Sequence, residues 1–203
     1  MRIHFLKTKN IILVLRYNIY NMNFPQKLET KRLYLRFFVK DDFKAFYKLI
    51  SNEEIIKNFY IIDQIKEIKK VKELFDSLIN PYNSLKSFLI IAITDKENEN
   101  FIGFCGLKDL KRSSDVLTFY ALLPEYRGFG YAIECMKKFF EYAFLRLELV
   151  KIVAFINPHY KTSWRVAERI GMKYMGHIKY KNFNPDPMFF VIEKKEFEAQ
   201  QLY

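Results

Sequence analysis

Two glycines and an arginine stand where a β-prone segment gives way to a helical one. The ten residues LPEYRGFGYA (123–132) follow the apolar segment 116–122, and apolar side chains then recur at helical spacing as far as Leu147. The first N–H groups of a helix have no intrahelical partner, and the helix dipole places partial positive charge behind them. Glycine lets a ligand come close to that backbone. The loop therefore predicts an anion-binding site.

The spacing of the glycines in the loop excludes two common classes of phosphate-binding loop. A dinucleotide-binding loop needs a third glycine where this chain has Ile133, and a P-loop needs Gly-Lys-Ser/Thr, which does not follow Gly130. The pattern Arg-x-x-Gly-x-Gly/Ala is matched by Arg127, Gly130 and Ala132. With its flanks, the loop resembles the acetyl-CoA loop of the GCN5-related N-acetyltransferases (GNAT), most closely their ribosomal-protein-alanine acetyltransferase-like (RimJ/RimL-like) branch. The alternative is a strand–turn–helix junction whose glycines serve packing alone.

Three further segments carry the same resemblance, in the family's order. LETKRLYLR (28–36) is similar to the branch's opening strand ETxRLxLR, and FIGFCGL (101–107) is similar to its central strand IGxxGL. SWRVAERIGM (163–172) is similar to its helix SxRVxEKxGF. The resemblance extends over roughly residues 26–197.

The hydrophobic periodicity predicts strands and helices in runs. We expect strands at 33–38, 88–94, 101–110, 116–122, 151–156, 172–180 and 188–196, and helices at 41–50, 53–59, 63–79 and 132–147, with one more helix ended by Gly171. This order indicates an α/β architecture with helices on both faces of a mixed sheet. The resemblance implies the acyl-CoA N-acyltransferase (GNAT) fold, with a mostly antiparallel sheet of about six or seven strands.

The resemblance also implies a reaction and a cosubstrate. In the family, loop N–H groups bind the diphosphate of acetyl-CoA, and the pantetheine arm lies where the strand before the loop splays from the next one. The acceptor is then a primary amine, either a protein N-terminus or a small molecule. The residues implied to bind acetyl-CoA are Leu122, Leu123, Arg127, Gly128, Phe129, Gly130, Tyr131 and Ala132.

Acyl transfer needs a neutral amine, and the leaving thiolate benefits from a proton. The family's segment NxxS supplies an Asn to the cofactor and a Ser near the sulfur; here Tyr160 replaces that Asn, and Ser163 matches the Ser. The resemblance thus makes Ser163, or the phenol of Tyr160, the proton donor. Alternatively, Thr162 or Ser163 only caps a helix.

The general base is not fixed by the sequence. Leu117 stands where the family often has an acidic residue. Asp115, Tyr120, His159 and Glu54 are other candidates, and a water-relayed base or an already neutral amine would need no side chain. Leu117 and Tyr160 together also support the rival hypothesis of a non-catalytic acyl-CoA-binding or partner-binding module.

The composition limits the number of domains, the state of the cysteines and the class of partner. A chain of 203 residues with 50% hydrophobic content can form one substantial core. Cys105 and Cys135 lie within a predicted strand and helix, which favours reduced thiols and a cytoplasmic protein, and no metal-ligand spacing accompanies the three histidines. The net charge of +11 could attract nucleic acid, but the lysines are spread without a basic stripe, so we expect no nucleic-acid partner.

The N-terminal segment 1–21 is treated separately from the domain 22–203. Its apolar run 11–15 is too short to span a bilayer, ends at Arg16 and lacks a signal-peptide cleavage site. We interpret 1–21 as an extension that is disordered or lies upstream of a true start at Met22; an added strand or anchoring helix is the alternative. We expect no membrane partner, consider a homodimer, and expect 63–79 to form one wall of the acceptor site.

Overall fold

The computed structural model describes residues 24–53, 55, 68–79, 88–110, 115–180 and 185–200. In this part of the chain, eight strands form one sheet in the order β1-β2-β3-β4-β5-β6-β8-β7. Neighbours are antiparallel except β5 and β6, which are parallel. The strands are β1 (Leu28–Glu29), β2 (Leu33–Arg36), β3 (Phe88–Asp95), β4 (Phe101–Asp109), β5 (Val116–Leu122), β6 (Lys151–Ile156), β7 (Lys173–His177) and β8 (Met188–Glu193).

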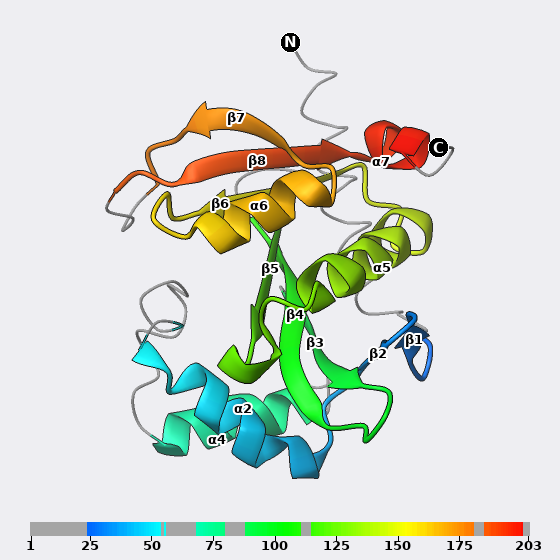
Figure 1. The fold of residues 1–203 in the computed structure, drawn as a ribbon, viewed down its shortest axis with the longest axis vertical. Coiled ribbons are helices and arrows are strands. Elements are labelled where there is room, and N and C mark those ends of the chain that lie inside the picture. Colours follow the sequence, from blue (N-terminus) through cyan, green and yellow to red (C-terminus); the bar gives the residue numbers. More distant parts are fainter. Residues whose placement is uncertain are drawn as a thin grey trace, which may run out of the picture.

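Helices cover both faces of this sheet, as the sequence predicts (Figure 1). One face packs against α2 (Phe43–Ile50) and α4 (Ile68–Ile79) through a cluster that includes Phe46 and Phe75. The other face packs against α5 (Tyr131–Leu145) and α6 (Lys161–Arg169). The short 3-10 helices η1 (Lys40–Asp42) and η3 (Pro124–Tyr126) and the C-terminal helix α7 (Lys194–Gln200) complete the described elements. The predicted α/β fold is confirmed.

Several predicted boundaries are wrong. The last strand was predicted to run to Glu196, but it ends at Glu193 and α7 follows, because the polar run from Glu193 to Glu196 no longer alternates. The strands predicted at 33–38 and 172–180 are shorter, at Leu33–Arg36 and Lys173–His177. An eighth strand exceeds the six or seven expected, since the two residues of β1 are too few to give a periodic pattern. Of the predicted helix 63–79, residues 63–67 lie outside the described residues, as do most of 53–59 and all of 1–21.

The glycines of the predicted motifs have specific reasons in the fold. A β-carbon on Gly103 would lie 2.2 Å from the carbonyl oxygen of Ala121, and one on Gly106 would lie 2.5 Å from the ring of Phe119. These two positions let β4 and β5 pack closely. Gly171 has φ +89°, and the N–H groups of Gly171 and Met172 donate to the last turn of α6, which confirms it as the cap of that helix.

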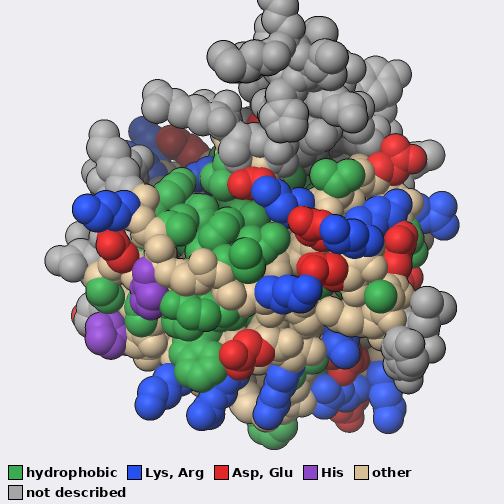
Figure 2. All heavy atoms as spheres, turned by 90° about the horizontal axis from the view of Figure 1, so that it is seen from above, with side chains coloured by type: hydrophobic (Ala, Val, Ile, Leu, Met, Phe, Trp, Pro, Cys, Tyr) green, Lys and Arg blue, Asp and Glu red, His purple; other side chains and the backbone are tan. Residues whose placement is uncertain are grey.

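Both cysteines are buried and free, Cys105 on β4 and Cys135 in α5. Burial, with the neighbouring Cys135 thiol, raises the pKa of Cys105 well above its usual value, so this thiol is unreactive at neutral pH. No helix within the described ranges is long and apolar enough to cross a membrane. Figure 2 shows the face over β7 and β8, where hydrophobic side chains gather and basic side chains are interspersed with acidic ones.

Candidate active site

The parallel strands β5 and β6 separate soon after they meet. Their ladder contains two pairs, Val116 with Ile152 and Leu117 with Val153. Beyond Leu117, β5 continues on its other side in register with β4, and β6 continues in register with β8. The edges of β5 and β6 that face each other are therefore unpaired toward their C-terminal ends. This is the splay that the resemblance implies.

The predicted anion-binding loop begins where β5 ends. Gly128 and Gly130 both have positive φ, at +86° and +81°, and Gly130 is the N-cap of α5. The first hydrogen bond of that helix runs from Glu134 N to Gly130 O at 3.1 Å, and no side chain caps the helix. The N–H groups of residues 131–133 are thus left for another acceptor. Strand, turn and helix start are all as the sequence predicts.

The other predicted cofactor residues lie around this loop. The side chains of Leu122, Leu123 and Ala132 are buried, whereas Phe129 is 62% exposed. Arg127 is half-buried, and its Nε donates to the carbonyl oxygen of Leu122 at 3.1 Å. This bond fastens the loop to the end of β5. Arg127 therefore shapes the loop from within the protein.

Ser163 lies in the first turn of α6 and faces β5. The N-cap of α6 is Tyr160, so the alternative interpretation of Ser163 as a helix cap is wrong. The Ser163 hydroxyl instead lies near the phenol of Tyr120 and acts to lower its pKa; Tyr120 lies on β5 at the point where that strand has left β6. Two hydroxyl groups thus meet between the splayed strands and α6.

The phenol of Tyr120 keeps its proton near neutral pH. Burial raises the pKa of Tyr120 to about 12, against the opposing effects of the nearby Ser163 hydroxyl and the positive charge of Arg127. The ordinary value for tyrosine is near 10. Tyr120 therefore stays neutral throughout the pH range of most enzymes, and it is unsuited to the role of general base.

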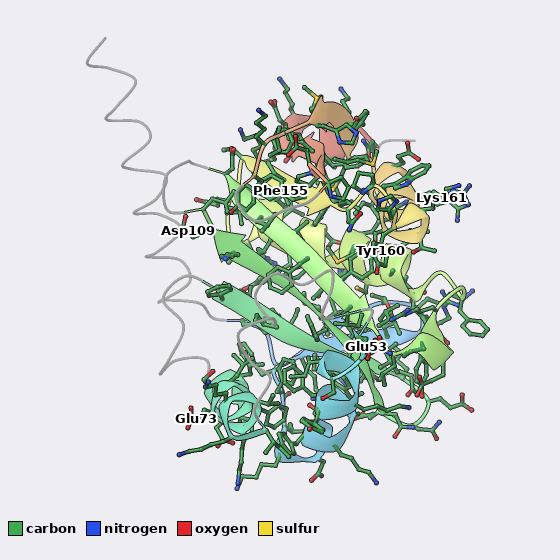
Figure 3. The ribbon with its side chains drawn as sticks, turned by 90° about the vertical axis from the view of Figure 1, so that its left-hand side faces the viewer. Glu53, Glu73, Asp109, Phe155, Tyr160 and Lys161 are labelled. Atoms are coloured by element: carbon green, nitrogen blue, oxygen red, sulfur yellow. The ribbon has the colours of Figure 1, made fainter. Side chains whose placement is uncertain are left out.

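Tyr160 directly precedes α6 and is the N-cap residue of that helix. Figure 3 shows Tyr160 and Lys161 at the start of that helix. The side chain of Tyr160 is half-buried, and its carbonyl oxygen accepts the N–H of Ser163 at 3.0 Å. Tyr160 is thus next to Ser163 in the same turn.

The candidate bases are scattered. Asp115 is ion-paired with Lys151 and precedes β5, at the opposite end of that strand from the loop. Leu117 is half-buried, His159 is exposed, and Glu54 lies outside the described residues. Among the described candidates, no carboxylate therefore joins the Tyr120–Ser163 pair.

One polar cluster at the loop was not predicted from the sequence. Arg32, from the turn before β2, donates from Nε to Glu134 Oε2 at 2.7 Å and from Nη1 to the carbonyl oxygen of Phe129 at 3.0 Å. Thr30 Oγ1 donates to Glu134 Oε1 at 2.7 Å. The motif ETxRLxLR contains Thr30 and Arg32, but their partner lies far along the chain, so periodicity could not reveal the contact.

Comparisons with known proteins agree with this geometry. A family model described as an acetyltransferase (GNAT) domain matches residues 32–173. Within the described residues, no group of three or more His, Cys, Asp or Glu side chains could hold a metal ion.

Two relatives come from Bacillus subtilis (strain 168). The uncharacterized protein YkkB is 29% identical over 160 residues, covering 78% of this chain and 91% of its own length. The uncharacterized N-acetyltransferase YnaD is 26% identical over 152 residues, covering 75% and 85%.

Solved structures share the fold. An acetyltransferase (GNAT family) from Bacillus anthracis superposes with a TM-score of 0.71 at 21% identity, covering 84% of this chain and 99% of that one. The spermidine N-acetyltransferase from Vibrio cholerae, in complex with CoA and spermine, gives a TM-score of 0.68 at 20% identity, covering 82% and 98%. The family model covers most of the chain, and the loop, the splay and the sheet order all fit this family. The protein therefore belongs to the GNAT acetyltransferase family.

Proposed function

We propose that the protein is an acetyl-CoA-dependent N-acetyltransferase that moves the acetyl group to a primary amine by direct transfer in a ternary complex. The observation that carries this proposal is the two-pair ladder between β5 and β6, which ends beside a glycine loop at a helix N-terminus. An extended thioester arm can use the unpaired strand edge, while its diphosphate meets the N–H groups of the loop.

The proposed binding residues act mostly through their backbone. The loop 127–132 takes the diphosphate, and Leu122 and Leu123 line the pantetheine arm where β5 ends. Gly128 and Gly130 hold the positive φ that turns the loop. Any other residue there would be strained by about 1 to 2 kcal/mol.

In the proposed reaction, the neutral amine nitrogen attacks the thioester carbonyl carbon. A C–N bond forms, the C–S bond breaks with its electron pair passing to sulfur, the amine loses a proton, and the thiolate gains one. Ser163 donates that proton, the neighbouring neutral phenol of Tyr120 resupplies the serine, and water returns a proton to the phenol. Tyr160, next in the same turn, is the alternative donor. Because Leu117 replaces the expected acid, water takes the proton that the nitrogen loses as the C–N bond forms. Before the attack, the amine either gives a first proton to water or arrives already neutral.

The proposed acceptor is either a protein N-terminal α-amine, as the ribosomal-protein-alanine acetyltransferase-like branch implies, or a small-molecule amine. The fold shared with a spermidine N-acetyltransferase supports an amine in general. We further propose that α4, within the predicted segment 63–79, contributes to the acceptor side, since it covers the opposite face of the sheet from α5 and α6.

Calorimetry with acetyl-CoA and with desulfo-CoA tests the first half of the proposal. Binding of neither ligand at millimolar concentration would overturn it. A panel of amines and peptide N-termini, followed by release of the CoA thiol, tests the second half. Binding without turnover across the whole panel would instead support a non-catalytic acyl-CoA-binding module.

We also propose the domain to be 22–203, preceded by the extension 1–21. The two buried free thiols support a cytoplasmic location, where thiols stay reduced. A homodimer stays a prediction, which sedimentation of the purified chain would test.

A further inference from the structure

The side chains of Thr30, Arg32 and Glu134 form a cluster that contacts the proposed diphosphate loop. Glu134 is in the first turn of α5, and its carboxylate accepts three hydrogen bonds, from the Thr30 hydroxyl, the Arg32 backbone N–H and the Arg32 guanidinium, each at 2.7 Å. Burial alone would raise the pKa of Glu134, but these bonds outweigh it and the pKa is lowered. The carboxylate is therefore charged, and it fixes the guanidinium in one place.

The guanidinium held in this way contacts the loop on both sides of Gly130. Nη1 donates to the carbonyl oxygen of Phe129 at 3.0 Å, and the guanidinium lies 4.4 Å from the ring centroid of Tyr131. In a trans peptide the C=O and the following N–H point in opposite directions. Because Arg32 holds the Phe129 carbonyl, the N–H of Gly130 must point away from the Arg32 group that holds it.

We propose that Arg32 is a positioning residue for cosubstrate binding: by holding the Phe129–Gly130 peptide, it aims the Gly130 N–H at the diphosphate. Glu134 and Thr30 serve the same end by fixing Arg32. This inference rests on the proposed use of acetyl-CoA, and it adds a role that the loop sequence alone does not contain. It makes the turn before β2, far away in sequence, a part of the anion site.

The role has a counterintuitive consequence for Glu134. A carboxylate beside a diphosphate repels it, so charge alone predicts that Glu134→Gln tightens CoA binding. If Glu134 acts by anchoring Arg32, the same substitution weakens CoA binding. The two accounts therefore predict opposite signs.

The test measures CoA affinity by calorimetry for the wild type, Arg32→Met and Glu134→Gln. Arg32→Met should bind about 10- to 100-fold more weakly, the effect expected when one hydrogen bond to a charged group is misdirected. Lys31→Met is the matched control, because it removes the same positive charge from an exposed side chain one residue away from Arg32. Melting temperatures of the unliganded variants report any general loss of stability.

Two further measurements distinguish a positioning role of Arg32 from a long-range charge effect and from a general loss of activity. The loss in Arg32→Met should persist at about 1 M salt, where charges separated by more than about 3 Å are screened. Turnover with S-acetylpantetheine, which has no phosphate, should be unchanged in Arg32→Met, since the diphosphate contact is absent.

Tighter binding by Glu134→Gln, a loss in Arg32→Met that disappears at high salt, or an equal loss with S-acetylpantetheine would each overturn the inference. Equal CoA affinities of the wild type and Arg32→Met would also overturn the inference. A wild type that binds no CoA would instead overturn the proposed function itself, so the two failures are distinguishable.

Discussion

The hydroxyl of Ser163 can protonate a thiolate only if another donor replaces its proton, and the neighbouring phenol of Tyr120 can do so. Ser163→Ala should therefore lower kcat about 10- to 1000-fold, within or just below the usual span for general acid catalysis. Acetyl-CoA affinity should change little, because the proposed contacts with the diphosphate and the pantetheine arm involve other residues. Steady-state kinetics with calorimetry of the same samples measures both.

Thr162→Ala is the control for Ser163→Ala, since Thr162 is an exposed hydroxyl residue in the same helical turn. Its kcat should equal that of the wild type. Tyr160→Phe, alone and combined with Ser163→Ala, shows whether the other phenol takes over the transfer. A double variant with wild-type kcat would remove both residues from the mechanism.

The high pKa of Tyr120 gives a pH prediction. Since burial raises this pKa to about 12, the folded protein favours the neutral phenol. That contribution to stability is complete below the unfolded value near pH 10, and it is lost as the pH rises through the folded value. Tyr120→Phe should therefore flatten the alkaline fall of the unfolding free energy, measured by denaturant titration from pH 9 to about 11. An unchanged alkaline slope in this variant would contradict the shift.

At the residue scale, the sequence predicted the loop glycines because their motif is continuous, whereas the catalytic role of Ser163 stays a prediction. The sequence did not predict the proximity of Tyr120 to Ser163 or the Arg32–Glu134 pair. Both are formed between elements that only the folded sheet brings together. Tyr120 is a candidate base in the sequence, and its burial between β5 and α6, which raises its pKa to about 12, argues against that role.

Among the elements, the loop at the start of α5 depends on backbone geometry. Gly130→Glu should abolish CoA binding, because it combines strain at φ +81° with a carboxylate beside the diphosphate. Gly176→Ala is a matched control: Gly176 has φ +100° on β7, and a β-carbon there would meet no atom within 4 Å. The control should lose stability and keep its CoA affinity in calorimetry. Retained affinity in Gly130→Glu would mean that the diphosphate binds elsewhere.

The junction of β2 and α2 depends on a buried ion pair. Asp42 is 4% exposed, and its carboxylate accepts from Arg36 Nη1 at 2.7 Å, Arg36 Nη2 at 3.0 Å and the Val39 N–H at 2.9 Å. Asp42→Asn leaves Arg36 without its counter-charge, so it should cost about 3 kcal/mol of unfolding free energy. Asp41→Asn, exposed and adjacent, should cost nearly nothing in the same denaturant titration. Equal stabilities of the two variants would contradict the role given to the pair.

The sequence predicted most elements because amphipathic periodicity is strong where one face is buried. The strands β3 to β6 and the helix α5 have boundaries within one or two residues of the prediction. Periodicity failed at the chain's last elements, where Phe197 faces the core from α7 rather than from a longer β8. Periodicity alone also could not place the β5–β6 splay, which was expected only from the family resemblance, since pairing in a sheet depends on strands from elsewhere in the chain.

At the scale of the whole molecule, the net charge of +11 should act on the anionic cosubstrate over a distance. On the face in Figure 2, basic side chains are interspersed with acidic ones. The lysines and arginines are also spread along the sequence, so we attribute the field to the overall excess of positive charge. We expect the KM for acetyl-CoA to rise with ionic strength while kcat stays constant, because salt screens encounter but not the proton transfer between Tyr120, Ser163 and sulfur. Turnover measured from low to about 1 M salt checks both quantities. An RNA or DNA titration serves as the control and should give no saturable complex even at low salt, where a nucleic-acid-binding protein would bind most tightly. A KM that does not change with salt would show that the contacts of the loop, and not the charge of the molecule, determine how acetyl-CoA is captured.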